Sequence, residues 1–204
     1  MTTTKTFDLP GFMFSHFNRV DFGGDLFSQS PAGIRFDIGF EHVYRAVELF
    51  HFAIPAEHAC IVAAQDWTLD GTLHKRYTPL FEMKGIFRPE TYSLQSTQVF
   101  PIEETPYRLT WTCLSAQDIN AQDLFQGIAN REQDGAPKIS SGVYLIDPQA
   151  KVIVHMYDDR GLDVIAAERK TLRPMFERYS GWFVEHWRGK IEVRFKRIPD
   201  LEED

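Results

Sequence analysis

Apolar and polar residues alternate along several short stretches of this chain, which is typical of strands with one buried face. Residues 33–39 read Gly-Ile-Arg-Phe-Asp-Ile-Gly and show this alternation in its simplest form. In the middle of the chain the gaps between such stretches are too short for a helical crossover, so the strands there are expected to pair antiparallel. Strands are expected at 33–39, 58–68, 80–87, 92–102, 107–115 and 191–195.

A β-hairpin is the strongest local signal. Residues 141–146 and 151–157 are rich in Val, Ile and Tyr, and they flank the segment Asp147-Pro148-Gln149-Ala150. Proline presets φ in the second position of a turn. The Asp147 side chain is expected to accept hydrogen bonds from the turn backbone.

Three stretches repeat apolar residues at the spacing of one helix face. They are 40–53, 118–130 and 171–187, and Thr171 is the expected N-cap of the last. These elements predict an α+β fold, in which a mainly antiparallel sheet of about six strands has the helices 40–53 and 171–187 packed on one face. The length of 204 residues fits a single domain, with residues 1–9 disordered.

Composition narrows the class of partner. The chain has 22 basic and 29 acidic residues and a formal net charge of −7, which disfavours contacts with nucleic-acid phosphates and suits a basic protein partner. Cys60 and Cys113 lie in apolar, strand-like runs, which favours reduced thiols over a disulfide. Neither a membrane helix nor a signal peptide is evident. We therefore expect no nucleic acid, no membrane and a cytoplasmic location.

One stretch carries more charge than its surroundings predict. The segment 155–163 reads His-Met-Tyr-Asp-Asp-Arg-Gly-Leu-Asp and lies between the apolar runs 152–154 and 164–167. Charged groups near the core of a sheet are costly unless they are paired. The expected binding or structural polar cluster consists of His155, Tyr157, Asp158, Asp159, Arg160 and Asp163.

Two interpretations of this cluster stay open. In a functional site, the carboxylates bind a cation or a basic partner, Arg160 binds an anion, and His155 moves a proton near neutral pH. In a structural cluster, Asp158 or Asp159 binds the turn backbone, Gly161 supplies an unusual backbone conformation, and Arg160 neutralises a carboxylate. The spacing matches neither an EF-hand loop nor a helical zinc site, and no nucleophile motif is present. No catalytic residue, metal or cofactor is assigned.

Two upstream features receive plainer interpretations. Gly23-Gly24 is expected to be a loop, because no strand and helix surround it as they would a phosphate-binding loop. Arg35 and Asp37 share the polar face of their strand and are expected to form a solvated or cross-strand ion pair.

The C-terminal part of the chain resembles a known family. Residues 142–146, the core Tyr157-Asp158-Asp159-Arg160-Gly161 with its continuation to Ile165, and residues 171–182 are similar to the domain-of-unknown-function 3885 family. The similar block covers roughly 137–187, and 34–39 also resembles a segment near the start of longer members. The resemblance implies a common fold and a mostly bacterial origin, and it brings no assigned activity.

Three classes of function follow, and whether the chain is an enzyme stays open. The first is a non-enzymatic protein-binding module, which the acidic charge and the lack of a catalytic motif favour; a toxin-neutralising protein is one version, by analogy of fold alone. The second is a hydrolase or phosphoryl-handling enzyme built on the ionisable residues of 155–163, with pKa values tuned by burial. The third is a structural or oligomer-forming module.

Overall fold

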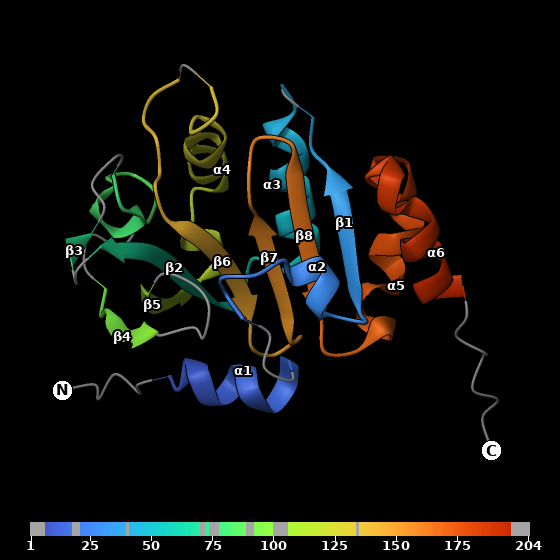
Figure 1. Ribbon diagram of the computed structural model, residues 1–204, viewed down its shortest axis with the longest axis horizontal. Helices are drawn as coiled ribbons and strands as arrows, with labels where there is room; N and C mark the ends of the chain where they lie inside the picture. Colours follow the sequence, from blue (N-terminus) through green and yellow to red (C-terminus); the bar gives the residue numbers. More distant parts are fainter. Residues whose placement is uncertain are drawn as a thin grey trace.

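The first strand of the chain lies beside the last one in a single antiparallel sheet. A computed structural model describes residues 7–17, 21–39, 41–69, 72–73, 78–88, 92–99, 106–133 and 135–196. Seven strands follow the order β1-β8-β7-β6-β2-β5-β4, and β3 pairs with β2 (Figure 1). The strands are β1 Gly33–Asp37, β2 Ala59–Leu69, β3 Thr72–Leu73, β4 Gln95–Val99, β5 Tyr107–Ser115, β6 Gly142–Asp147, β7 Val152–Met156 and β8 Gly161–Ala166.

Helices complete the α+β fold that the sequence predicts. The α-helices are α1 Leu9–Phe17, α2 Leu26–Gln29, α3 Val43–Ala53, α4 Ala121–Ala129, α5 Arg169–Arg178 and α6 Arg188–Lys196. Short 3-10 turns lie at η1 Leu80–Glu82, η2 Ala116–Asp118, η3 Ser180–Trp182 and η4 Glu185–Trp187. Within the described part of the chain, no helix has both the length and the apolar character that a membrane-spanning segment requires.

The sheet has a fully covered face and a partly covered face. Helices α3, α4 and α5 bury apolar residues such as Phe50, Phe125 and Met175 on the first face, where the sequence placed the helices 40–53 and 171–187. Helix α1 packs Leu9 and Met13 against the opposite face, on which the sequence predicted no helix. The short helix α2 lies over β8 and β1 (Figure 1). This second face carries polar residues as well as the apolar residues that contact α1.

The β1 edge is covered by the C-terminal segment. Val184 N–H donates to Arg35 O at 3.2 Å, and α6 lies beside this edge (Figure 1). Arg194 Nη1 donates to Phe27 O at 3.1 Å and to Gly33 O at 3.2 Å. These contacts connect α6 to α2 and to the start of β1.

The hairpin prediction is confirmed. β6 and β7 pair antiparallel, and the Asp147 carboxylate accepts from Gln149 N–H at 2.8 Å and from Ala150 N–H at 2.9 Å. Its second oxygen lies 2.6 Å from His58 Nδ1. The buried carboxylate therefore organises the turn, as expected for Asp before Pro.

Two predicted C-terminal elements are wrong in type or length. Residues 191–195 are part of helix α6, because Ile191 and Phe195 are fully buried on one helical face whereas Val193 between them is 54% exposed. The helix expected over 171–187 ends at Arg178, where α5 gives way to two 3-10 turns.

Other boundaries also differ from the expectation. Residues 80–87 form η1 and a loop, not a strand, and 92–102 contributes β4 only over Gln95–Val99, since 100–105 lie outside the described residues. Disorder was expected for 1–9, of which 1–6 lie outside the described residues. Leu9 begins α1 and is fully buried.

Candidate functional site

A row of polar side chains crosses four neighbouring strands on the partly covered face. Arg35 of β1 lies opposite Asp163 of β8, and Asp163 lies opposite His155 of β7. The row continues to Tyr144 of β6, whose ring stacks on the His155 ring with 4.2 Å between centroids. Period-two alternation places these four residues on the side of the sheet opposite α3 and α5.

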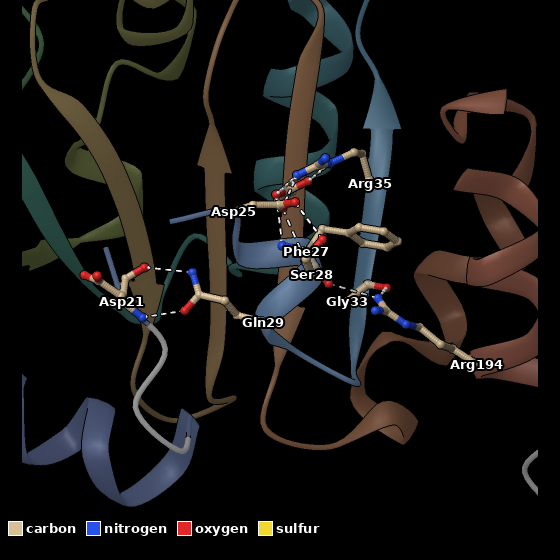
Figure 2. A network of polar contacts seen from close by, with 9 residues as sticks. Asp21, Asp25, Phe27, Ser28, Gln29, Gly33, Arg35 and Arg194 are labelled. Atoms are coloured by element: carbon tan, nitrogen blue, oxygen red, sulfur yellow. Dashed lines mark hydrogen bonds and ion pairs between the residues drawn. The ribbon is translucent and has the colours of Figure 1, made fainter. Parts of the chain in front are cut away.

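Arg35 and Asp163 form the centre of the row. Arg35 Nε and Nη2 each donate to the Asp163 carboxylate at 2.7 Å, and Phe27 N–H donates to the same carboxylate at 3.1 Å. Arg35 Nη2 also contacts Asp25, the N-cap of α2 (Figure 2). The hydrogen-bonded, two-pronged geometry matches the planar fork of arginine to a carboxylate.

Burial and hydrogen bonding have opposing effects on the pKa values of Asp163, Arg35 and Asp25. Burial raises the pKa of Asp163 above its ordinary value, and the hydrogen bonds from Arg35 offset part of that rise. Burial acts against the charge of Arg35, but its bonds to Asp163 prevail and raise its pKa. Asp25 is partly exposed, and bonds from Ser28 and Arg35 lower its pKa despite some desolvation. We therefore assign an ionised Arg35 between two carboxylates.

The turn between β7 and β8 explains much of the Tyr-Asp-Asp-Arg-Gly motif. The Asp158 carboxylate accepts from Arg160 N–H at 2.9 Å and from Gly161 N–H at 2.7 Å. A Cβ atom at Gly161 would overlap the hydroxyl and ring of Tyr157, so glycine is needed for close approach. Asp158 and Gly161 therefore act structurally, by shaping the turn that holds Tyr157.

Tyr157 connects this turn to the row of polar residues. Its ring lies 4.9 Å from the Arg35 guanidinium carbon, within the range of a cation–π interaction. Its backbone carbonyl accepts from Arg131 Nη2 at 2.7 Å, so the end of α4 is tied to the turn. Burial raises the pKa of the Tyr157 hydroxyl.

Asp159 and Arg160 lie apart from the row. Asp159 is buried, with 3.7 Å between its carboxylate and Arg160 Nε and 3.5 Å to Gln133 Nε2. The Arg160 side chain is 64% exposed. The predicted cluster thus divides into a structural turn and a set of three, His155, Tyr157 and Asp163, that faces a cavity.

This cavity has a volume of about 370 Å³, near the lower end of the range for small-ligand sites. One wall comes from the Gly23-Gly24 loop and the start of α2, and the floor comes from the polar face of the sheet. The lining residues that carry polar or aromatic side chains are Asp25, Arg35, Gln65, Trp67, Arg131, Ser140, Tyr144, His155, Tyr157 and Asp163.

His155 is neutral in this environment. Burial lowers its pKa to about 4, and the charges of Arg131 and Arg35 act in the same direction. Its Nδ1 lies 2.8 Å from Val143 O, which can only accept, so Nδ1 carries the proton. The remaining ring nitrogen, Nε2, therefore carries a lone pair.

The sequence did not identify several residues of this site. Arg35 was expected to pair with Asp37, but its carboxylate partners are Asp163 and Asp25, and Asp37 accepts instead from Gly39 N–H at 3.0 Å. Asp25, Gln65 and Tyr144 were not singled out. A charged residue within a half-buried strand was the available signal for Arg35, whereas nothing in the local sequence linked it to Asp163, 128 residues away.

Among the described residues, no three His, Cys, Asp or Glu side chains are grouped so as to hold a metal ion.

Comparisons with known proteins extend the resemblance seen in the sequence. The family model "Domain of unknown function (DUF3885)" matches residues 9–187, well beyond the C-terminal block of 137–187. The chain is similar to "Uncharacterized protein YnaE" of the bacterium Bacillus subtilis (strain 168), with 20% identity over 211 residues, covering 88% of this chain and 98% of the relative. No solved structure matches the chain. With most of its length matched, the chain belongs to the DUF3885 family.

Proposed function

We propose that this chain is a non-enzymatic binding protein that recognises a protein partner at the cavity beside Arg35 and Asp163. One observation supports this most: Arg35 and His155, the cavity residues suited to bind an anion or to move a proton, are each paired or buried in a way that keeps them in one protonation state near pH 7. Arg35 is held between Asp163 and Asp25, and His155 is neutral because its pKa is about 4.

Acid–base catalysis needs a group whose pKa lies near the working pH. Burial moves the pKa values of Tyr144 and Tyr157 upward and that of His155 downward, away from neutrality in each case. A phosphoryl group would in addition meet an Arg35 whose charge two carboxylates already balance. These features favour a preformed binding surface over the hydrolase or phosphoryl-handling alternative.

The proposed partner is a protein with a basic surface. The chain carries a formal net charge of −7, which would steer such a partner toward it. Trp67 lies at the cavity with 40% of its surface exposed, and exposed tryptophans are frequent anchors at protein interfaces. A toxin-neutralising role is one version. The proposal includes a cytoplasmic location, supported by the unpaired cysteines Cys60 and Cys113.

Site-specific photocrosslinking in the cell of origin tests this proposal. A benzophenone amino acid replaces Trp67 at the cavity and, as the control, the exposed Val193 of α6. A protein adduct that forms at 67, is absent at 193 and disappears with the second change Gln65→Met supports the proposal. No adduct at 67, or equal adducts at both positions, contradicts it. A hydrolytic or phosphoryl-transfer activity that Asp163→Asn abolishes without unfolding the protein would replace it with the enzymatic alternative.

A further inference from the structure

Another cavity lies over the part of the sheet where β2 and β5 pair. Its volume is about 310 Å³, at the small end of the range for ligand sites. Asp66 of β2 lines it, and Ala64, two residues earlier, belongs to the core beneath α3 and α4. Period-two alternation therefore puts this cavity on the side of the sheet opposite to Trp67 and the cavity beside Arg35.

Asp66 is a buried carboxylate with one oxygen open to this cavity. Only 8% of the residue is exposed. Its Oδ1 accepts from Ser141 Oγ at 2.5 Å, and Ser141 Oγ accepts from Leu80 N–H at 2.9 Å, so the carboxylate is held in place. Its Oδ2 has no hydrogen bond within the described residues, and it is not one of the enclosed side-chain atoms that lack a partner. This oxygen is therefore accessible from the cavity.

Arg108 of β5 faces Asp66 without bonding to it. The two residues lie directly opposite each other in the antiparallel pair, which places their Cβ atoms about 4.5–5.5 Å apart. Arg108 Nε is enclosed, whereas the terminal nitrogens Nη1 and Nη2 are not, and within the described residues none of the three has a hydrogen-bond partner. Both side chains line the same cavity, so one small ligand can contact Asp66 Oδ2 and the terminal nitrogens of Arg108.

The charges in this cavity favour a ligand with one positive and one negative group. Burial raises the pKa of Asp66; the Ser141 hydroxyl and the Arg108 charge offset part of the rise, and Glu82 adds to it. A positive group at Oδ2 would therefore stabilise the carboxylate. The planar guanidinium of Arg108 suits a carboxylate, to which it can donate two parallel hydrogen bonds.

The remaining wall of the cavity is apolar. Pro79, Phe81 and Leu94 line it, and the Leu94 side chain is among the exposed large apolar groups of the chain, at 49%. An apolar group of the ligand that covers these side chains would remove apolar surface from water.

We infer that this cavity takes a free α-amino acid with an apolar side chain, whose ammonium group donates to Asp66 Oδ2 and whose carboxylate accepts from the terminal nitrogens of Arg108. A free α-amino acid carries both charges on one carbon atom, which suits a carboxylate and a guanidinium on directly opposite residues. In a peptide chain these two groups are converted to amides or lie at opposite ends. The site is therefore separate from the protein-binding cavity of the proposed function.

Three probes that share the leucine side chain test the inference. L-Leucine carries both charges at pH 7, L-leucinamide lacks the carboxylate, and 4-methylpentanoate lacks the ammonium group. Isothermal titration calorimetry of the intact chain should show binding of L-leucine, with at least tenfold weaker binding of the other two probes. L-Phenylalanine tests a larger apolar side chain. No binding of either amino acid, or binding of L-leucinamide or 4-methylpentanoate as tight as that of L-leucine, overturns the inference.

Two variants assign each charge of the ligand to its residue. Arg108→Met should weaken L-leucine binding at least tenfold and remove the preference for L-leucine over L-leucinamide. Asp66→Asn keeps an oxygen for the Ser141 hydroxyl, and it should weaken L-leucine binding at least tenfold and remove the preference over 4-methylpentanoate. Lys170→Met, at an exposed site on α5, is the control and should leave all three affinities unchanged. Variants that melt early but keep the selectivity of the unmodified chain would show a structural pair and overturn the inference.

A measurement on the unmodified chain does not depend on how the variants fold. Nuclear magnetic resonance titration with L-leucine should shift the backbone amide signals of Asp66 and Arg108. Shifts confined to the residues around Arg35 and His155 overturn the inference. The crosslink at position 67 should persist in both variants, because the two cavities lie on opposite sides of the sheet. Failure of L-leucine to bind therefore leaves the proposed function standing.

Discussion

Arg35 and Asp163 lie opposite each other on adjacent strands and share two hydrogen bonds of 2.7 Å, although 128 residues separate them in the sequence. Asp163 is almost fully buried. The ion pair therefore joins the first and last strands of the sheet and lines the cavity.

Replacing one residue of this ion pair should lower the free energy of unfolding much more than replacing both residues. Arg35→Met leaves the Asp163 carboxylate buried without its main partner and should lower the free energy of unfolding by about 3–5 kcal/mol. The double variant Arg35→Met with Asp163→Leu should recover most of that loss. Urea denaturation followed by circular dichroism measures both. Lys170→Met, at an exposed site whose ion-pair partner Glu168 is also exposed, is the control and should change stability by less than about 0.5 kcal/mol. Additive effects of the two single changes would contradict the paired interpretation.

Gly161 should not tolerate a methyl group. Gly161→Ala places Cβ against the Tyr157 ring and should cost about 1–3 kcal/mol, as overpacking does in other cores. Calorimetry gives the size of the loss. Gly181→Ala is the matched control, because a Cβ there meets nothing within 4 Å. The cost of Gly161→Ala should shrink in a Tyr157→Ala background, and an undiminished cost there would place its origin elsewhere.

His155 should make the fold sensitive to acid between pH 7 and pH 5. Its pKa is about 4 in the fold against 6.5 for a free side chain, so the unfolded chain takes up a proton first. The contribution of neutral His155 is present above pH 6.5 and is lost as the pH falls toward 4. Linkage gives a loss of about 2 kcal/mol between pH 7 and pH 5.

The variant His155→Phe keeps a ring in the stack and should remove that part of the pH dependence. Urea unfolding at the two pH values measures the difference. His186→Phe, at an exposed site on η4, should behave like the unmodified chain. Identical pH profiles for His155→Phe and the unmodified chain would show that His155 is not the titrating group.

In helix α6, the sensitivity of residues 191–195 to mutation should follow a pattern that a strand would not show. Phe195→Ala should cost about 3–5 kcal/mol because the ring is fully buried, whereas Val193→Ala should cost less than about 0.5 kcal/mol. Thermal unfolding of the two variants distinguishes the cases. In a strand, 191, 193 and 195 would share one face, and all three positions would be sensitive.

Elements with a single consistent local signal were predicted well. The hairpin around Asp147 and the helix within 40–53 each combined clear spacing with a recognisable stop or turn, and both are present. In contrast, the apolar residues of 191–195 fit two patterns. Ile191, Val193 and Phe195 alternate with polar residues as in a strand, and Ile191 and Phe195 are four residues apart, as on one face of a helix. Only tertiary contacts, including those of Arg194 with α2 and with the start of β1, decide for the helix.

Only part of the candidate site could be predicted from the sequence, for a similar reason. Sequence reasoning found His155, Tyr157 and Asp163 because they are adjacent in a charged segment. Arg35 and Gln65 come from strands far away in the chain, and their roles depend on the order of strands in the sheet. Nothing in a single sequence links β1 to β8.

The position of β1 also affects how this protein is made. β1 can pair with β8 only after β8 has been synthesised. A ribosome that adds 5–20 residues per second reaches β8 on the order of 10 s after β1. Until then the nascent chain exposes an unpaired apolar strand containing Ile34 and Phe36. β8 is the last of the described strands to be synthesised, and its Asp163 lines the cavity. A chain terminated before β8 would therefore lack a complete recognition site.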